Sequence, residues 1–482
     1  MVRRASILLA AAVLCLACRA PRREAVSIAP PRAGARWHAL DAAARRDARL
    51  RGVWEAEGFG HLVVIADDMR VLHATSTRCV PDPGLVPGFA LYALGEDDTR
   101  LSLLHEDYGP ASEELQTRVD LRRIAALPAR CAAPGAVDTA TPGGVFDALA
   151  TLMDEHYAFF AERSVAWAPL RERYRPLAHR ASDADSLFPV LREMLGHIND
   201  GHLNLSRRGG PTFNAGRPAL RERLVASWRR EGAPGTSGDY VSAWHQRVVG
   251  SVHPLLDTGS RRDGAAGALE WGTIGDSVAY VRVNRFSGFT RDNAPRPAQL
   301  DSLRAALDRM LADIGGAKAA IVDVAMNGGG MDAAAILVAR RFADHERPAL
   351  TKQVRGGRSQ TVTLRPEGER QFTRPVVLLT SEITASAAEV FVLMMRALPH
   401  VTHAGEATRG MLSSLLPKPL PNGYMLTLSH QTVRDVEGRL FEGTGVPPDE
   451  EVVLFPSGRE ATGLAEAIRG VSDRLARAER PR

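Results

Sequence analysis

The sequence predicts an α/β protein whose core sheet is mainly parallel, preceded by a small β-domain. In residues 266–456, continuous apolar runs such as 277–283 and 319–324 alternate with amphipathic helical segments, which is typical of buried parallel strands covered by helices. Residues 145–265 carry their apolar side chains mostly at helical spacing. Short apolar runs separated by turn residues in 48–107 indicate a meander of β-strands.

Length and composition agree with this division. The chain has 482 residues, of which 45% are hydrophobic and 24% charged, as in a soluble globular protein of two or three domains. After an N-terminal leader, we expect a β-domain at 38–135, a second domain at 145–456 with a helical part (145–265) and an α/β core (266–456), and a C-terminal helix within 457–482.

The N-terminus has the features of an export signal. Arg3 and Arg4 precede an apolar run that is too short to span a bilayer, so we interpret residues 1–18 as a signal peptide. The run ends like a bacterial lipoprotein processing site, with Cys18 as the lipidated residue; an ordinary secretory signal cut nearby is the alternative. Residues 19–37 are rich in Pro, Arg and Ala and predict a flexible tether. We therefore expect an exported protein, lipid-anchored on the periplasmic side of the bacterial envelope.

The charge distribution argues against nucleic-acid binding. Residues 1–37 contribute +6 to a total of +5, which leaves −1 for the rest of the chain. The high isoelectric point thus comes from the leader and tether, and the sequence gives no sign of a basic face for nucleic acid.

Two cysteines remain after export, Cys79 and Cys131. In an oxidising compartment such a pair most simply forms a disulfide, although two buried free thiols are the alternative. Neither cysteine has a metal-binding pattern, and His197 and His202 lack the spacing of a zinc motif. We expect no metal and no organic cofactor.

Ser386 is the first candidate for chemistry. It follows the apolar run 375–380 and precedes a helical pattern, among small alanines. It could cap that helix, or its Oγ could be a nucleophile with the Ala387 N–H available to an oxyanion. Gly328 and Gly329 follow another predicted strand, either as a tight turn or as further backbone donors.

A serine nucleophile needs a base, and the order of several short motifs suggests one. The series resembles the C-terminal processing serine peptidase family, which includes the tail-specific proteases, the tricorn core protease and the interphotoreceptor retinoid-binding protein, over roughly residues 145–456. The motifs that carry the resemblance are DGH at 200–202, NGGG at 327–330, TASAAE at 384–389, AGEATRG at 404–410 and FEGTGVPPD at 441–449.

The resemblance implies a crotonase-like peptidase core acting on peptide or protein substrates. One branch of the family uses a lysine 25 residues after the serine, but Met411 stands there. The tricorn-like branch uses a histidine and a glutamate, and its pattern matches this chain. It implies Ser386 as nucleophile, His202 and Glu442 as its partners, oxyanion donors at Ala387, Gly328 and Gly329, and Glu389 and Asp200 as supporting carboxylates.

Three departures from the family pattern keep a second hypothesis open. Gly201 precedes His202 where tricorn has a serine, Ala325 and Met326 replace an Arg-containing stretch, and residues 206–265 contain no PDZ-like pattern. A non-catalytic ligand- or peptide-binding module of the same fold is therefore the alternative to a peptidase, and an esterase with the same catalytic residues is a third. The sequence leaves the oligomeric state open.

Overall fold

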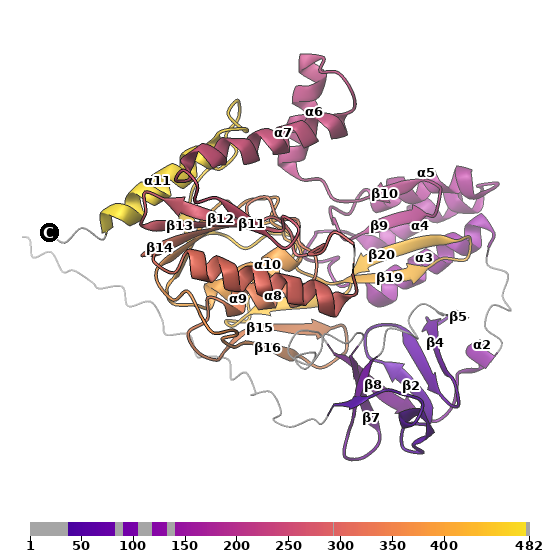
Figure 1. The fold of residues 1–482 in the computed structure, drawn as a ribbon. Helices are drawn as coiled ribbons and strands as arrows, with labels where there is room; N and C mark the ends of the chain where they lie inside the picture. Colours follow the sequence, from indigo (N-terminus) through magenta and orange to yellow (C-terminus); the bar gives the residue numbers. More distant parts are fainter. Residues whose placement is uncertain (1–36, 82–89, 105–117, 133–139, 293, 479–482) are drawn as a thin grey trace, which may run out of the picture.

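The computed structural model describes residues 37–81, 90–104, 118–132, 140–292 and 294–478, arranged in four sheets with their helices (Figure 1). The predicted signal peptide, Cys18 and nearly all of the tether lie outside these ranges. Within them, no helix combines the length and the hydropathy needed to cross a bilayer.

The first sheet comes from the N-terminal part of the chain and is antiparallel throughout, in the order β1-β6-β7-β8-β2-β3-β4-β5. Buried apolar side chains such as Trp54, Leu101 and Leu121 pack in one cluster on it. The strands are β1 (His38–Ala39), β2 (Gly52–Ala56), β3 (His61–Ile65), β4 (Met69–Ala74), β5 (Cys79–Pro81), β6 (Leu91–Leu94), β7 (Arg100–Leu104) and β8 (Val119–Ile124).

A disulfide joins this sheet to the short helix α2 (Ala129–Ala132). The two Sγ atoms of Cys79 and Cys131 lie 2.01 Å apart and the Cα atoms 5.0 Å apart. Both residues are buried beside Leu62 and Leu72. The bridge therefore ties the end of the β-domain segment to its edge strand β5.

The central sheet has seven strands in the order β11-β12-β13-β14-β17-β18-β22, and β13 to β22 run parallel. The fold class predicted from the sequence is thereby confirmed. The strands are β11 (Arg262–Gly264), β12 (Leu269–Ile274), β13 (Val278–Val283), β14 (Ala319–Asp323), β17 (Val376–Thr380), β18 (Val401–Gly405) and β22 (Glu450–Glu451).

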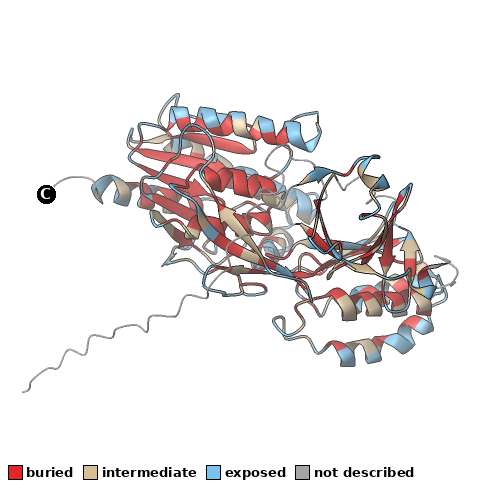
Figure 2. Cartoon of the chain, turned by 90° about the horizontal axis from the view of Figure 1, so that it is seen from below, coloured by how far each residue is buried: buried red, intermediate tan, exposed pale blue. Residues whose placement is uncertain are grey.

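Helices cover both faces of this sheet, which explains why β13, β14 and β17 are apolar at nearly every position. Ala279 and Val281 of β13 pack with α8, α9 and α10, whereas Val278 and Tyr280 pack with α7 and α11 on the other face. Figure 2 shows the sheet buried between helices whose outer sides are exposed. The helices are α8 (Arg296–Asp313), α9 (Asp332–Arg340), α10 (Ala387–Arg396), α7 (Ser237–Val252) and α11 (Gly463–Ala478).

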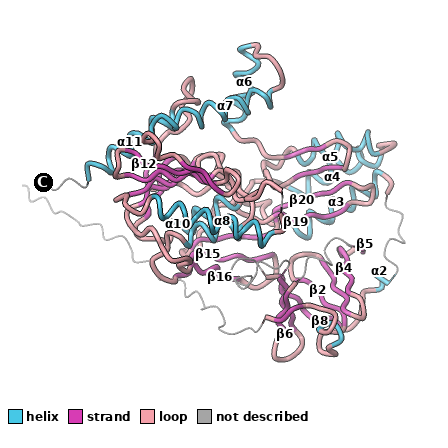
Figure 3. The backbone as a smooth tube through the Cα atoms, viewed as in Figure 1, coloured by secondary structure: helices cyan, strands magenta, loops and turns pink. Residues whose placement is uncertain are grey.

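A four-stranded sheet, β10-β9-β20-β19, joins two distant parts of the chain (Figure 3). β9 (Asn204–Arg207) and β10 (Thr212–Asn214) follow the helices α3 (Pro142–His156), α4 (Trp167–His179) and α5 (Ala184–Leu195), which pack on the sheet. β19 (Leu415–Pro419) and β20 (Tyr424–Ser429) come from the C-terminal part, and Leu205 pairs with Leu426. This pairing places the loop before β9 beside the loop before β19.

Two smaller features complete the fold. A three-stranded antiparallel sheet contains β16 (Gln360–Leu364), β15 (Arg347–Val354) and β21 (Gln431–Asp435). Helix α6 (Ala219–Glu231) pairs with α7 in a hairpin that projects from the body (Figure 1), in the stretch where the sequence lacks a PDZ-like pattern.

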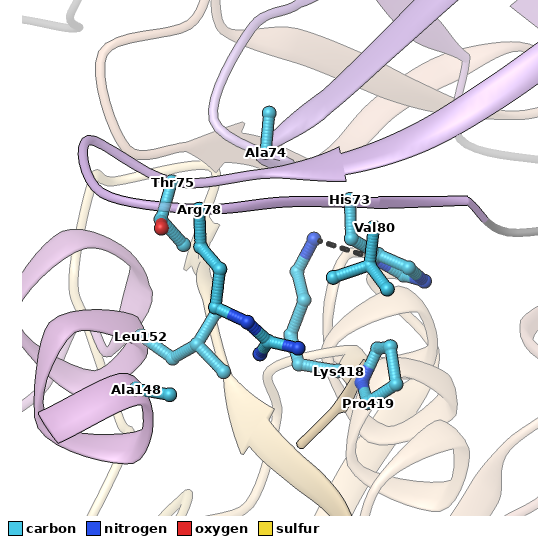
Figure 4. A pocket seen from close by; sticks show the side chains of 9 residues that line it. All are labelled: His73, Ala74, Thr75, Arg78, Val80, Ala148, Leu152, Lys418 and Pro419. Carbon is cyan, nitrogen blue, oxygen red and sulfur yellow. Dashed lines mark hydrogen bonds between the residues drawn. The ribbon is translucent and has the colours of Figure 1, made fainter. Parts of the chain in front are cut away.

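The N-terminal sheet contacts the rest of the molecule through a buried lysine. Lys418 of β19 donates from Nζ to the carbonyls of Phe59 (2.5 Å) and Gly60 (3.1 Å) and lies 3.3 Å from His73 Nδ1. Figure 4 shows Lys418 and His73 facing each other across a small hollow that Arg78 and Leu152 also line. The β-domain is thus packed onto the four-stranded sheet by polar as well as apolar contacts.

Candidate active site

Ser386 stands at a strained turn between β17 and α10. Its backbone has φ 58° and ψ −125°, a region that a residue with a Cβ adopts only when its surroundings enforce it. It occupies the N-cap position of α10, in a capping-box arrangement with Glu389. The residue is half-buried, so its side chain is not enclosed by the core.

The carboxylate of Glu389 holds this turn in place. It accepts hydrogen bonds from the Ser386 N–H (3.1 Å), the Gly410 N–H (2.7 Å), the Met411 N–H (2.7 Å) and Thr408 Oγ1 (2.6 Å). Burial raises the pKa of Glu389 to about 7, although these hydrogen bonds act in the opposite direction. Glu389 therefore joins the turn at Ser386 to the loop before β19.

The glycine turn after β14 lies directly against Ser386. A Cβ on Gly329 would come within 2.7 Å of Ser386 Cβ and 3.1 Å of the Ala387 nitrogen, and φ of +102° also requires glycine here. The Gly329 N–H, however, donates to Asn327 Oδ1 at 2.8 Å, so in this structure it is not the free oxyanion donor that we expected. Within the described residues, the N–H groups of Ala387 and Gly328 have no hydrogen-bond partner, and Gly328 faces open space.

The ring of His202 is buried in a loop fixed by its backbone. The His202 N–H donates to Asp200 Oδ1 (2.8 Å) and its carbonyl accepts from Thr427 Oγ1 (2.9 Å). Burial lowers the pKa of His202, helped by Arg163 and opposed by Asp200 and Asp332. The imidazole is therefore neutral near pH 7, and its Nδ1 is buried without a hydrogen-bond partner among the described residues.

A close packing contact links the His202 loop to Ser386. A Cβ on Gly201 would come within 2.4 Å of Met411 Sδ, so any larger residue there would have to displace the thioether. Met411 in turn donates its N–H to Glu389, which also holds the Ser386 N–H. Neighbouring segments thus connect the two residues predicted to act as base and nucleophile.

Glu442 lies in the same buried region but makes no hydrogen bond to the His202 imidazole. Its Oε1 accepts from Arg163 Nη2 at 2.6 Å and its Oε2 from the Ser413 N–H at 3.0 Å. Burial, together with the nearby Asp200, raises the pKa of Glu442 to about 8. The structure therefore gives no direct hydrogen bond from Glu442 to His202.

Arg163 is the central cation of this region, and the sequence did not reveal it. Its Nε lies 3.4 Å from Asp200 Oδ2, its Nη2 also donates to the Gly410 carbonyl at 3.1 Å, and its Nη1 donates to the Asn199 carbonyl. Its side chain is only 6% exposed. Arg163 thus binds together the loop before β9, the loop before β19 and Glu442.

The structure offers no obvious metal site. Across the ranges that it describes, no group of three or more His, Cys, Asp or Glu side chains is arranged to hold a metal ion. The reactive groups near Ser386 are instead backbone N–H groups, one buried histidine and several buried carboxylates.

Two known protein families match parts of this sequence. The sequence pattern of peptidase family S41 fits residues 277–452, and that of the tricorn protease C1 domain fits residues 139–196. The chain carries a peptidase family S41 domain. Ser386, Glu389 and Glu442 lie inside the S41 match, whereas Asp200 and His202 lie between the two matched ranges and join the site through the four-stranded sheet.

Individual relatives agree with the S41 assignment. Carboxy-terminal processing protease CtpA of Bacillus subtilis (strain 168) is 27% identical over 139 residues, which is 29% of this chain and 29% of the relative. The match thus spans less than a third of CtpA. The structure of a candidate peptidase from Parabacteroides merdae ATCC 43184 is 27% identical, with a TM-score of 0.52, over 69% of this chain and 96% of the other. Mature CPAF, at 11% identity, shares the fold with a TM-score of 0.51 over 71% and 99% of the chains.

Proposed function

We propose that the protein is an exported serine peptidase that cleaves peptides or unfolded protein segments, with Ser386 as nucleophile and His202 as general base. The strained turn at Ser386 carries this proposal, because it presents Oγ beside the unpartnered N–H of Ala387. The S41 domain around it supports the same chemistry.

In the proposed reaction, neutral His202 accepts the proton of Ser386 as Oγ attacks the scissile carbonyl carbon. The N–H groups of Ala387 and Gly328 stabilise the negative charge that develops on the carbonyl oxygen. When the tetrahedral intermediate collapses, the imidazolium gives its proton to the leaving amine. Water activated by the same histidine then hydrolyses the acyl-enzyme.

The buried carboxylates have an electrostatic role in this proposal. The imidazolium that forms during attack is a new positive charge in a desolvated region, and Asp200, whose carboxylate binds the His202 backbone, stabilises it. Glu442 acts from further away, because Arg163 and the Ser413 N–H occupy its oxygens. We therefore expect Glu442→Gln to reduce kcat less than His202→Ala does.

Reaction with a fluorophosphonate probe tests the proposal directly. An activated serine forms a phosphonyl adduct, so we expect mass spectrometry of the labelled protein to place the adduct on Ser386. Ser386→Ala should abolish labelling and His202→Ala should slow it by several orders of magnitude. Labelling at the same rate in His202→Ala would refute the assignment of the base.

A non-catalytic binding module of the same fold is the alternative. The unpartnered His202 Nδ1 favours it, because catalytic histidines are usually oriented by a carboxylate on that nitrogen. The two functions differ in one observation: a binding module leaves the probe unreacted and still binds peptide. An esterase would instead react with the probe and hydrolyse small esters but no peptide.

Export and anchoring belong to the same proposal. The apolar leader and the cysteine at its end support lipidation at Cys18. Cells fed labelled palmitate should incorporate it into the wild type and not into Cys18→Ser. A wild type that takes up no label would indicate the ordinary secretory signal instead.

A further inference from the structure

Helix α6 and the loop directly before it line an open, shallow groove, which we call the arginine groove. The loop 216–218 and the side chains of Arg221, Val225 and Arg229 line it, together with Glu222. Arg221, Val225 and Arg229 are spaced at four-residue intervals and therefore share one face of the helix. The apolar Val225 between two arginines gives this face an alternating charged and apolar surface.

The charge of the arginine groove is not balanced within the molecule. Arg217, Arg221 and Arg229 are exposed, and none of them has a carboxylate within ion-pair distance among the described residues. Two other arginines of α6 differ: Arg223 lies 3.7 Å from Glu382 and Arg230 lies 3.9 Å from Glu231. Cations that remain unpaired along one groove attract an anionic ligand.

The inner end of the groove touches the loop that carries His202. A Cβ on Gly216 would come within 2.7 Å of Gly201 Cα, and the Arg217 N–H donates to Asn199 Oδ1 at 2.8 Å. His202 follows Gly201 directly in the sequence. The inner end of the groove therefore lies against the loop that carries the predicted base.

A second contact connects the same end to the nucleophile. Arg409 donates from Nη2 to Asn199 Oδ1 at 3.3 Å and from its backbone N–H to the Thr384 carbonyl at 2.9 Å. Thr384 precedes Ser386 by two residues. Arg409 thus extends the line of arginines from α6 to the turn at Ser386.

We propose that the arginine groove binds an acidic segment of the peptide substrate, next to the residues that are cleaved. This inference rests on the proposed peptidase function and adds a substrate preference to it. An extended peptide fits a groove that ends at the loop carrying His202, whereas a flat membrane would need a broad basic face. Residues 38–482 carry a net charge of −1, so the folded part as a whole is not drawn to an anionic surface.

The test uses Ser386→Ala protein and two labelled peptides, one with a run of glutamates and one with glutamines at the same positions. Fluorescence anisotropy at low salt should show the glutamate peptide binding roughly tenfold more tightly, since each of the two or three new ion pairs contributes a modest factor. The preference should shrink as salt rises. Equal affinities for the two peptides would overturn the proposal.

Charge reversal of the groove arginines shows whether the groove causes the preference for the glutamate peptide. Arg221→Glu/Arg229→Glu should abolish the preference, whereas Arg230→Glu, an exposed arginine of the same helix outside the groove, should retain it. A preference that survives the double reversal would contradict the proposal. A third outcome would also overturn it. If the protein shows no peptide preference but binds phosphatidylglycerol vesicles, and the double reversal removes that binding, then the groove binds a membrane surface instead.

Cleavage assays separate this inference from the proposed function. In protein with Ser386 intact, the double reversal should raise KM for the glutamate peptide and leave kcat for the glutamine peptide unchanged. If neither peptide is cleaved but the binding preference persists, the peptidase assignment fails and the groove assignment stands. If both are cleaved with the same KM before and after charge reversal, the groove assignment fails alone.

Discussion

Gly201 and Met411 fit each other closely: a Cβ on Gly201 would lie 2.4 Å from Met411 Sδ and 2.5 Å from its Cε. Gly201 stands where the tricorn-like pattern has a serine, and Met411 stands where the other branch of the family has its lysine. The structure accounts for them together, because the missing side chain at 201 makes room for the thioether at 411. The contact lies between the His202 loop and the loop that Glu389 holds.

We therefore predict that Gly201→Ala is costly only while Met411 is present. The added methyl must displace the thioether, which we expect to lower the free energy of unfolding by about 1–3 kcal/mol and to reduce the rate of probe labelling at Ser386. Met411→Ala should restore most of both losses. A double-mutant cycle by denaturant unfolding measures the coupling, and additive effects would show that the contact is unimportant.

The pH dependence of the reaction should follow the neutral form of His202. Only the neutral imidazole accepts the Ser386 proton, so the rate rises as pH passes upward through the histidine pKa. Burial lowers that pKa from 6.5, so the rise should be centred below pH 6.5 and the rate should be level at pH 7.5. Initial rates of probe labelling across pH test this. A rate that rises only above pH 8.5 would indicate a lysine base.

The sequence was sufficient for some of these features and not for others, for physical reasons. Buried parallel strands form nearly continuous apolar runs, so the central sheet could be predicted. The pairing of β9 with β20 could not, because short strands more than two hundred residues apart carry no local sign of their partner. Likewise, Ser386 stands in a recognisable motif, whereas Arg163 is one of many arginines and owes its role to the carboxylates that the fold brings around it.

The sequence was also insufficient to identify the oxyanion donors. The sequence placed Gly328 and Gly329 in one turn after a strand, which made both N–H groups candidates. Only the folded turn shows that the Asn327 side chain takes the Gly329 N–H. The requirement for glycine at 329 comes instead from the close approach of Ser386. A backbone donor cannot be assigned until its competing local hydrogen bonds are known.

The disulfide between Cys79 and Cys131 should stabilise the β-domain measurably. The two residues are separated by 52 positions, for which the chain-entropy model gives a contribution of roughly 4 kcal/mol. We expect thiol titration of the unfolded, non-reduced mature protein to find neither Cys79 nor Cys131 reactive. Reduction, or Cys79→Ala/Cys131→Ala, should lower the unfolding midpoint of the β-domain. Reactive thiols at both positions without reductant would contradict the bridge.

Arg163 should be essential to the fold of the site because it binds two buried acidic side chains, Asp200 and Glu442. Arg163→Leu leaves Glu442 and Asp200 without their cation, and breaking a buried ion pair in this way costs about 3–5 kcal/mol. If charge is the reason, Arg163→Leu/Asp200→Asn should be less destabilised than Arg163→Leu alone, because the double variant no longer buries the uncompensated charge of Asp200. Denaturant unfolding of the two variants measures the difference.

A third variant, Arg163→Lys, separates packing from electrostatics in the reaction. Arg163→Lys retains the positive charge but cannot reach Asp200, Glu442 and the two backbone carbonyls together. We expect it to keep most of the stability while slowing probe labelling of Ser386, since the His202 loop loses its attachment to the loop before β19. In Arg163→Leu, the unpaired carboxylates should also raise the pKa of His202 and shift the rise in rate to higher pH. An unchanged pH profile in Arg163→Leu, with stability lost equally in the single and double variants, would show that Arg163 acts through packing alone.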